Sequence, residues 1–497
     1  MELLDNYQFR GGIVFCTLIV CLIISQHVSA QDSIVHDPNE YLSHTLPVLY
    51  INTEGNLPVV SKEEYLSATY YLDANGFDQY ESIGSAEAPL ALEIKGRGNA
   101  SWNKPKKPYR LKLEKKAAML GMPKSKHWCL MAAYADWRGK GRDYMAFQIS
   151  RLMGMPWTPG NVPCELVLNG DYMGLYFIVE HIRIAKERVN IFDQEEVTPN
   201  DSVPMDVTGG WLLEIDNYNE ENQVRLMDID GSPLRITYHS PEDLSTEQDI
   251  YIRDLLNKTN NAINTTYKGS REWEDLIDID ALARFYMINE VVDNQEAFSG
   301  SCYFYKDKGD SAKFIFGPVW DFGSSMGSRL NGEVHNFSYE PDVTYVHNHW
   351  IPEIAKFPRF KIALRKYWHK YRDEVFPQME QVAIDYGNLI AQAGEADYRR
   401  WGDGSSLGVK KTLKNYVNVC LENKRLFLAS QWDQDYTYPL GDINLDGTVD
   451  VTDVNLMINL ILGKEVKLWP EANPDLNDSG TVDVTDVNAV INALLGK

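Results

Sequence analysis

Asn289 to Asp307 reads NEVVDNQEAFSGSCYFYKD, and Gly317 to Ser325 reads GPVWDFGSS. The apolar residues from Ile277 to Val292 recur at helical spacing, so the first stretch begins as the acid-rich end of a helix. The aromatic residues that follow read as a hairpin. The sequence therefore predicts a helix, a hairpin and an Asp-Phe-Gly loop in this order.

This order is typical of protein kinases, which place a catalytic base first and a metal-binding Asp of an Asp-Phe-Gly afterwards. A third stretch, Lys95 to Lys112, reads KGRGNASWNKPKKPYRLK. It is a basic turn with glycines followed by an alternating strand, and it could present backbone amides, Arg97 and lysines to an anion. A solvent-exposed hairpin tip is the alternative interpretation.

Outward from these motifs, the two halves of the long region differ. In the first half, apolar runs such as Pro89 to Lys95 and Cys164 to Leu168 alternate with turn residues such as Asn75-Gly76, which indicates strands and hairpins. In the second half, Phe360 to Tyr386 has helical spacing. Strands followed by helices predict an α+β domain.

Seven stretches in order make the region from Leu46 to Ser430 resemble the spore-coat CotH kinase family, a secreted, atypical protein-kinase-like group. They are LPVLYINTEG, IKGRGNASW, KKPYRLKL, ELVLNGDYMGLYFIVEHI, GGWLLEIDNY, NEVVDNQEAFSGSCYFYKD and GPVWDFG. The resemblance implies a kinase-like domain over residues 31–430, with a strand-rich first half and a helical second half.

The resemblance also implies a nucleotide site. Asp321 would coordinate Mg²⁺ or Mn²⁺, and a lysine of KKPYRLK, Lys107 before Lys112, would steady the phosphates of ATP beside Arg97. In this interpretation Ser301 occupies the position of a metal-binding Asn, although a hydroxyl is a poorer ligand for magnesium than an amide oxygen.

The position of the family's catalytic base falls on Glu296, which is one methylene longer than Asp and could still accept a hydroxyl proton. Asp293 is the nearby alternative. Glu180 either pairs with the lysine or is a surface acid at a strand end. Trp211 and Tyr218 are expected to pack in a core rather than to stack on a sugar.

The last 57 residues repeat themselves with a period of 33 residues, as in GDINLDGTVDVTDVNLMINLILG and PDLNDSGTVDVTDVNAVINALLG. Calcium loops of 12 residues place oxygen ligands at positions 1, 3, 5, 7, 9 and 12 and Gly at position 6. The glycines are Gly447 and Gly480. The ligand positions are Asp442, Asn444, Asp446, Thr448, Asp450 and Asp453 in the first loop, and Asp475, Asn477, Ser479, Thr481, Asp483 and Asp486 in the second. Ser479 replaces an acid, so the second loop should bind calcium more weakly.

Each loop is followed by one apolar helix, Val454 to Leu462 or Val487 to Leu495, and position 12 is Asp. The segment 441–497 resembles a type I dockerin, a small all-α module that binds cohesin domains of bacterial cellulosome-like assemblies. The resemblance places partner contacts at Val451-Thr452 and Val484-Thr485, whose identity in both repeats would allow two pseudo-symmetric docking orientations. We expect calcium to fold this segment, because the carboxylates repel one another without it.

The chain begins with features of a signal peptide over residues 1–30. Arg10 precedes an apolar run from Ile13 to Ile24, and Val28-Ser29-Ala30 resembles a cleavage site. The run is too short to span a bilayer, and no later stretch approaches that length. We therefore expect a secreted protein without a transmembrane span in its mature form. A cohesin-bearing scaffold on the cell surface would attach the protein there. Residues 431–440 are turn-rich and read as a linker.

Composition supports an ordered protein that does not bind nucleic acid. The net charge is −23, whereas phosphate recognition along a nucleic acid needs a basic surface. Hydrophobic residues make up 44% of the chain, enough for sizeable cores in two to four domains. The four cysteines outside the signal segment, Cys129, Cys164, Cys302 and Cys420, lie far apart and are expected to be small buried hydrophobic residues.

Three functions follow from these features. The first is phosphate transfer from ATP to Ser or Thr of a secreted protein, by a kinase-like domain that a calcium-dependent dockerin tethers to a cohesin-bearing complex. The second is a non-catalytic module that binds polysaccharide or a cell surface within a polysaccharide-degrading assembly. The third, a glycoside hydrolase, needs two carboxylates at a set separation, which a single sequence does not establish.

Overall fold

The structure is a computed structural model, and it describes residues 35–497 apart from 135, 137–138, 197–205, 228–232, 327–336, 338–349 and 403–407. The proposed signal segment 1–30 lies outside the described residues. Within the described ranges, no helix has the length and apolar character needed to cross a membrane.

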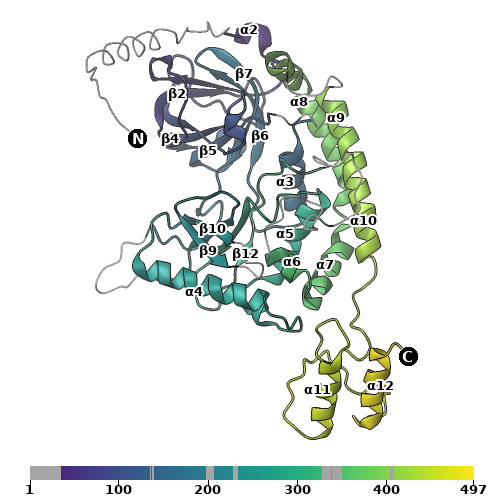
Figure 1. The fold of residues 1–497 in the computed structure, drawn as a ribbon. Coiled ribbons are helices and arrows are strands. Elements are labelled where there is room, and N and C mark those ends of the chain that lie inside the picture. Colours follow the sequence, from purple (N-terminus) through teal and green to yellow (C-terminus); the bar gives the residue numbers. More distant parts are fainter. Residues whose placement is uncertain are drawn as a thin grey trace, which may run out of the picture.

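Seven strands of the first half close into a barrel (Figure 1). They are β1 (Val48–Thr53), β2 (Leu66–Asp73), β3 (Leu90–Gly96), β4 (Tyr109–Ala117), β5 (Ser125–Met131), β6 (Asn161–Leu168) and β7 (Asp171–Glu180), in the spatial order β1-β2-β3-β4-β5-β7-β6. The parallel pair β1–β6 closes the barrel, and the other pairs are antiparallel. Inward-facing residues such as Leu49, Leu111 and Ile178 are fully buried, and they alternate with outward-facing residues.

A second sheet of five strands lies beside the barrel, with the order β12-β11-β8-β10-β9. Its strands are β8 (Trp211–Ile215), β9 (Gln223–Met227), β10 (Pro233–Ser240), β11 (Cys302–Lys306) and β12 (Ile315–Phe316). The predicted hairpin after residue 300 is the pair β11–β12, and Asp-Phe-Gly follows it in a loop.

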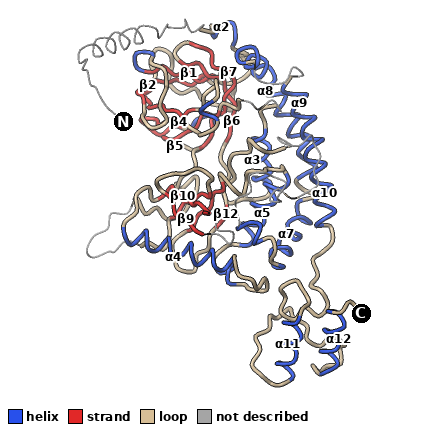
Figure 2. The backbone as a smooth tube through the Cα atoms, viewed as in Figure 1, coloured by secondary structure: helices blue, strands red, loops and turns tan. Residues whose placement is uncertain are grey.

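Helices dominate the second half, as Figure 2 shows. In the first half are α2 (Pro38–Tyr41) and α3 (Arg142–Leu152). The others are α4 (Thr246–Ile263), α5 (Ile279–Val291), α6 (Trp350–Ile354), α7 (Pro358–Tyr371), α8 (Met379–Trp401), α9 (Val409–Tyr416) and α10 (Glu422–Trp432), with a π-helical turn at Val417–Leu421. The prediction of strands first and helices later is confirmed. The helix expected over 360–386 is two helices, because a 3₁₀ turn with Pro377 interrupts it at Phe376–Gln378.

The helices and the second sheet share one large core that also contains α3 and one face of β7. Trp211 lies in this core, fully buried, as expected, whereas Tyr218 is 44% exposed and does not pack in a core. The four cysteines are buried, as predicted, and none is joined to another by a disulfide within the described residues.

A buried ion cluster connects the barrel to α8. Lys106 Nζ lies 2.5 Å from Asp397 Oδ1 and also donates to the carbonyl of Leu175 on β7. Lys140 lies 3.1 Å from the other oxygen of Asp397. Burial of these charged groups therefore depends on both the barrel and the helical region, because an unpaired buried charge is strongly unfavourable.

The C-terminal segment contains two further helices, α11 (Val451–Ile461) and α12 (Val484–Leu494), which pack on each other around Met457 and Val490. Each begins at position 10 of a loop with the predicted calcium-binding pattern, three residues earlier than expected, because Asp450 and Asp483 cap the helices. The linker that precedes these loops contacts the helical region. Asp433 accepts hydrogen bonds from Trp368 of α7 and from Arg372, the residue that follows α7.

Candidate functional site

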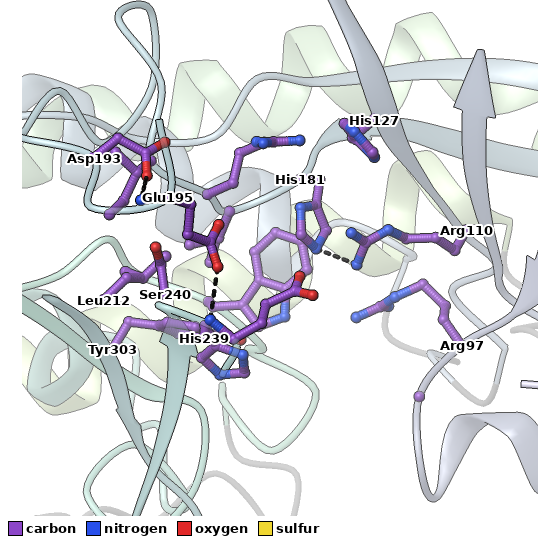
Figure 3. A pocket seen from close by; sticks show the side chains of 16 residues that line it. Arg97, Arg110, His127, His181, Asp193, Glu195, Leu212, His239, Ser240 and Tyr303 are labelled. Atoms are coloured by element: carbon purple, nitrogen blue, oxygen red, sulfur yellow. Dashed lines mark hydrogen bonds between the residues drawn. The ribbon is translucent and has the colours of Figure 1, made fainter. Parts of the chain in front are cut away.

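A cavity of about 350 Å³ lies between the outer face of the barrel and the second sheet (Figure 3). The barrel side of this cleft is basic. It carries Arg97, Arg110, His127, His181 and Arg183. The opposite side carries acids and aromatic residues, among them Asp193, Glu195, Glu242, Tyr303 and Trp320. A cleft with one strongly basic wall is suited to a phosphate-bearing ligand.

The β3–β4 hairpin positions the two cleft arginines that lie on it. Arg97 directly follows β3, where Gly98 has a φ of +78° and a Cβ would lie 2.2 Å from Ser101 Oγ, so the tight turn needs glycine. On β4, Tyr109 and Leu111 point into the barrel, so Arg110 between them points out into the cleft. The predicted basic turn and strand are confirmed as this hairpin.

Two histidines of the barrel wall, His127 and His181, are neutral near pH 7. Burial and the nearby arginines Arg183, Arg110 and Arg188 lower the pKa of His127 to about 3. Burial, followed by Arg110 and Arg188, lowers the pKa of His181 well below its usual value. Arg110 Nη1 donates to His181 Nε2, as Figure 3 shows, which places the proton of the neutral ring on Nδ1. The arginines therefore supply the positive charge of this wall.

Asp321 directly follows Trp320, a cleft residue whose ring Arg97 covers at 5.5 Å. A small hollow next to the cleft shares Trp320 with it and is lined by Asp143, Asn161 and Asp321, among others. The first turn of α3 holds the Asp-Phe-Gly backbone: Phe322 N–H donates to Asp143 Oδ1 at 2.9 Å. Arg142 donates to the carbonyl of Gly323.

Asp143 is a site residue that sequence reasoning missed. Burial and the negative charge of Asp321 raise the pKa of Asp143 from 3.8 to about 7. Asn161, in the same hollow, has a buried Oδ1 without a hydrogen-bond partner. No motif surrounds Asp143 in the sequence; the one available signal is an acid in the first turn of an expected helix, which is usually a simple helix-end charge.

The two expected candidates for the base have different surroundings. Asp293 is buried and pairs with Lys424, whose Nζ lies 3.0 Å from Asp293 Oδ1. Glu296 is half-buried. Burial, Asp216, Glu296 and Asp321 all raise the pKa of Tyr218, so the carboxylates of Glu296 and Asp321 act on the same exposed phenol.

The lysines expected to hold phosphates do not line the cleft. Lys107 Nζ donates to the carbonyl of Trp102 at 2.6 Å, and Lys112 forms an exposed ion pair with Glu93 at 2.9 Å. Lys112 points to the same side of β4 as Arg110, but two residues farther from the cleft. Ser301, the residue expected at the second metal position, directly precedes β11 with a φ of +52°.

Glu180 fits neither expectation made for it. The side chain is buried, so it is not a surface acid, and its partner is Arg188 at 3.5 Å rather than a lysine. Its other oxygen accepts the N–H of Gly160 at 2.8 Å. The last side chain of β7 is thus buried, and the alternation of apolar and polar residues along the strand does not predict this.

The two C-terminal loops have one geometry. In the first, Asp442 accepts the N–H groups of Asp446 and Gly447, and in the second, Asp475 accepts those of Ser479 and Gly480. Position 12 accepts backbone N–H groups in both loops, at Asp453 and Asp486. The loops therefore turn their position 1 and position 12 carboxylates inward.

These loops fit a cation. Burial, with the charges of Asp446 and Asp453, raises the pKa of Asp442 to about 6, so the first loop holds more negative charge than its surroundings favour. In the described residues no three His, Cys, Asp or Glu side chains are grouped so as to hold a metal ion by themselves. Calcium would therefore also draw on the amide, hydroxyl and main-chain oxygens of each loop, as six to eight ligands require.

The chain thus has two parts: a domain with a basic cleft beside paired carboxylates, and a small unit with two calcium-type loops. Comparison with protein families agrees. Residues 94–438 match the family CotH kinase protein, and residues 440–495 match the dockerin type I domain. The chain belongs to the CotH kinase family and ends in a type I dockerin domain. No curated protein matches it.

The suspected family and domain order are thereby confirmed. Type I dockerin domains bind calcium, occur in extracellular cellulosome components and imply a cohesin partner. The dockerin therefore attaches this CotH domain to a larger complex.

Proposed function

We propose that this protein is a secreted phosphotransferase that moves the γ-phosphate of ATP to Ser or Thr of extracellular proteins. One observation carries the proposal: Asp321 of the Asp-Phe-Gly lies beside Asp143 and next to Trp320, which is also part of the arginine-lined cleft. The proposed metal ligand Asp321 thus adjoins a residue of the cleft that holds the proposed phosphate ligands, and phosphate transfer is catalysed mainly by positioning and charge neutralisation.

Asp143 and Asp321 fit a divalent metal ion. Their mutual repulsion and burial raise the pKa of Asp143, and a cation between them would relieve this repulsion. Magnesium in nucleotide sites is typically held by one or two carboxylates together with substrate phosphates, so two carboxylates suffice. The bound Mg²⁺ or Mn²⁺ would neutralise charge on the phosphates.

Arg97 and Arg110 are the proposed phosphate ligands from the protein. Both guanidinium groups line the cleft, and Arg97 is held in place by the ring of Trp320. Lys107 and Lys112 were expected in this role from the family, but their ammonium groups are engaged elsewhere, with Trp102 and Glu93. We therefore assign this role to the arginines.

Glu296 is the proposed base. It retains contact with solvent, whereas Asp293 is buried and one of its oxygens is paired with the buried Lys424. A carboxylate that can be reached by a substrate hydroxyl is required for proton removal. Ser301 leaves the second metal position of the family with a weaker ligand, so the proposal relies on Asp143 and Asp321.

Phosphate transfer from labelled ATP by the whole secreted chain tests this proposal, with Mg²⁺ or Mn²⁺ and a bacterial secretome as acceptor. Asp321→Ala should abolish transfer. Arg110→Ala should raise the KM for ATP roughly ten-fold or more, since hydrogen bonds to charged groups contribute about 1.5–3 kcal/mol.

Lys112→Ala is the matched control, because it removes the same charge from the same side of β4, two residues away. We expect its KM for ATP to stay within about two-fold of wild type, because its ion pair is exposed. Absence of both phosphate transfer and ATP-dependent thermal stabilisation in wild type would refute the phosphotransferase.

The second candidate is a binding module that keeps this fold without chemistry. The exposed ring of Tyr218 near Glu296 and Asp321 favours it, since exposed aromatic rings are suited to stacking on sugars. Retention of the chain on insoluble cellulose or xylan, lost in Tyr218→Ala, would support this function. In either case we propose that the module boundaries are 31–430 and 441–497, and that a cohesin binds the second.

A further inference from the structure

The two calcium loops of the dockerin have nearly the same sequence but different surroundings. Asp442 and Asn444 of the first loop are 4% and 5% exposed. In the second loop, Asp475 is half-buried and Asn477 is exposed. A Cβ at Gly447 would lie 3.0 Å from Tyr436 Oη, whereas a Cβ at Gly480 would meet nothing within 4 Å. Within the described part of the chain, the first loop is therefore covered and the second is open.

The segment that follows α4 provides part of this cover. Tyr267 Oη donates to the carbonyl of Asn444, position 3 of the first loop, at 2.7 Å. A Cβ at Gly269 would lie 2.5 Å from the same carbonyl oxygen, so the two backbones approach as closely as glycine permits. The contact with Tyr267 and Gly269 therefore depends on the main-chain conformation of the first loop at Asn444.

A second group of contacts involves the segment between the two repeats. Trp469 Nε1 donates to the carbonyl of Gly269 at 3.1 Å, and the guanidinium of Arg271 lies 4.2 Å from the centre of the Trp469 ring. Arg271 also pairs with Glu471 at 2.8 Å, and Arg359 of α7 reaches the same carboxylate at 3.5 Å. Hydrogen bond, cation–π contact and ion pairs thus act together.

The linker is fastened as well. Arg365 of α7 donates to the carbonyl of Gln434 at 2.8 Å, and its guanidinium lies 5.5 Å from the ring of Tyr436. The linker therefore lies along α7. These contacts place the first calcium loop next to the surface of the CotH domain that covers this loop. Figure 1 shows the dockerin helices α11 and α12 beyond α7, at the end of the molecule away from the barrel.

We propose that calcium in the first loop locks the dockerin onto the CotH domain through an intramolecular joint. The joint consists of Tyr267, Gly269, Arg271 and Arg359 on one side and Asn444, Trp469 and Glu471 on the other. The inference rests on calcium binding by the proposed loop residues. A cation holds the carboxylates of the loop together, and their repulsion without it would displace the Asn444 carbonyl from Tyr267. By linkage, whatever favours the closed loop also favours the joint.

The joint has a consequence for the partner. The first residues of both dockerin helices stay accessible, since Val451 is 64% and Val484 67% exposed. The repeats are similar in sequence, but the described residues of the CotH domain contact the first loop and not the second. The two docking orientations are therefore no longer equivalent in the whole chain, and a bound partner would hold the CotH domain in a defined direction.

Distances between two spin labels test the joint in the whole chain. The labels are placed at Lys258→Cys on α4 and Asn488→Cys on α12, both exposed, while the four cysteines of the described residues are buried. We expect a narrow distance distribution with calcium and a broad one with chelator. Asp442→Ala should give the broad distribution even with calcium, whereas Asp475→Ala, its equivalent in the second loop, should keep the narrow one.

Two further variants separate the joint from folding of the dockerin. Trp469→Ala and Arg271→Ala leave all loop ligands in place, and we expect them to broaden the distribution while two calcium ions still bind. Arg253→Ala, an exposed ion-pair arginine on α4, is the control and should change nothing. A narrow distance distribution in Asp442→Ala or in Trp469→Ala would overturn this inference and leave the calcium proposal intact. A wild-type chain that binds no calcium would overturn the calcium proposal and this inference with it.

Discussion

At the scale of single residues, the Asp143–Asp321 pair distinguishes this site from a surface cleft. One carboxylate comes from the first turn of α3 and the other from the loop after β12, and the N–H of Phe322 connects the two segments. Two acids at close range in a partly buried hollow are unfavourable unless one is protonated or a cation binds. Such a conflict is common at functional sites.

This conflict makes a prediction about stability and pH. The pKa of Asp143 is about 7 in the folded chain and 3.8 in its ordinary state. Between these values the folded chain binds more protons than the unfolded chain, so the free energy of unfolding falls as the pH rises from about 4 to about 7. Asp143→Asn removes this effect and can still accept the N–H of Phe322.

We expect Asp143→Asn to be more stable than wild type by about 1–2 kcal/mol at pH 8 and equal to it near pH 4, because one pKa unit corresponds to about 1.4 kcal/mol and residual solvent contact reduces the full shift. Denaturant unfolding at several pH values measures this. The same variant should lose metal-supported phosphate transfer. A variant that is less stable than wild type at pH 8 would contradict the assignment.

At the scale of elements, α10 holds the end of α5 from which the proposed base segment departs. Lys424 of α10 is fully buried and lies 2.6 Å from Glu290 and 3.0 Å from Asp293. Burial of the lysine is offset by these two carboxylates, and the pKa of Lys424 is raised. The path from Asp293 to Glu296 is therefore defined by a helix more than 100 residues away.

Replacing Lys424 by Met should destabilise the chain by about 3–5 kcal/mol, because two buried carboxylates lose their compensating charge. Its neighbour Arg425 provides the control. Arg425 forms an exposed ion pair with Glu422 at 2.7 Å, and its replacement by Met should cost less than about 1 kcal/mol. Thermal and denaturant unfolding compare the two variants, and similar losses in both would argue against a buried ion triad.

At the scale of the whole molecule, the barrel and the helical region meet at charged as well as apolar contacts. Asp397 of α8 accepts the N–H of Leu175 at 2.9 Å and lies between Lys106 and Lys140. This cluster fixes the barrel relative to the helices behind it.

Asp397→Ala should lower the free energy of unfolding by about 3–5 kcal/mol, because it leaves buried lysine charge without its carboxylate. Asp385→Ala, an exposed acid on the same helix, is the control and should change stability by less than about 0.5 kcal/mol. Chemical denaturation followed by tryptophan fluorescence measures both. Equal stability of the two variants would show that the cluster does not hold the halves together.

Sequence reasoning reached those parts of the molecule whose physics is local. Strand alternation, turn residues and helical spacing predicted the α+β organisation, the hairpin of Arg97 and the helix from Ile277 to Val292, because each depends on neighbours along the chain. The duplicated loops were readable residue by residue, since a calcium loop takes its ligands from 12 consecutive positions.

The tertiary structure alone decided which distant groups meet. Closure of the barrel turned Arg110 rather than Lys107 or Lys112 into the cleft, and packing of α3 brought Asp143 to the Asp-Phe-Gly, whose Phe322 is 179 residues away. Packing also covered one of two nearly identical calcium loops and left the other open. Local periodicity does not predict such contacts, because burial and electrostatic coupling depend on which surfaces the whole chain brings together.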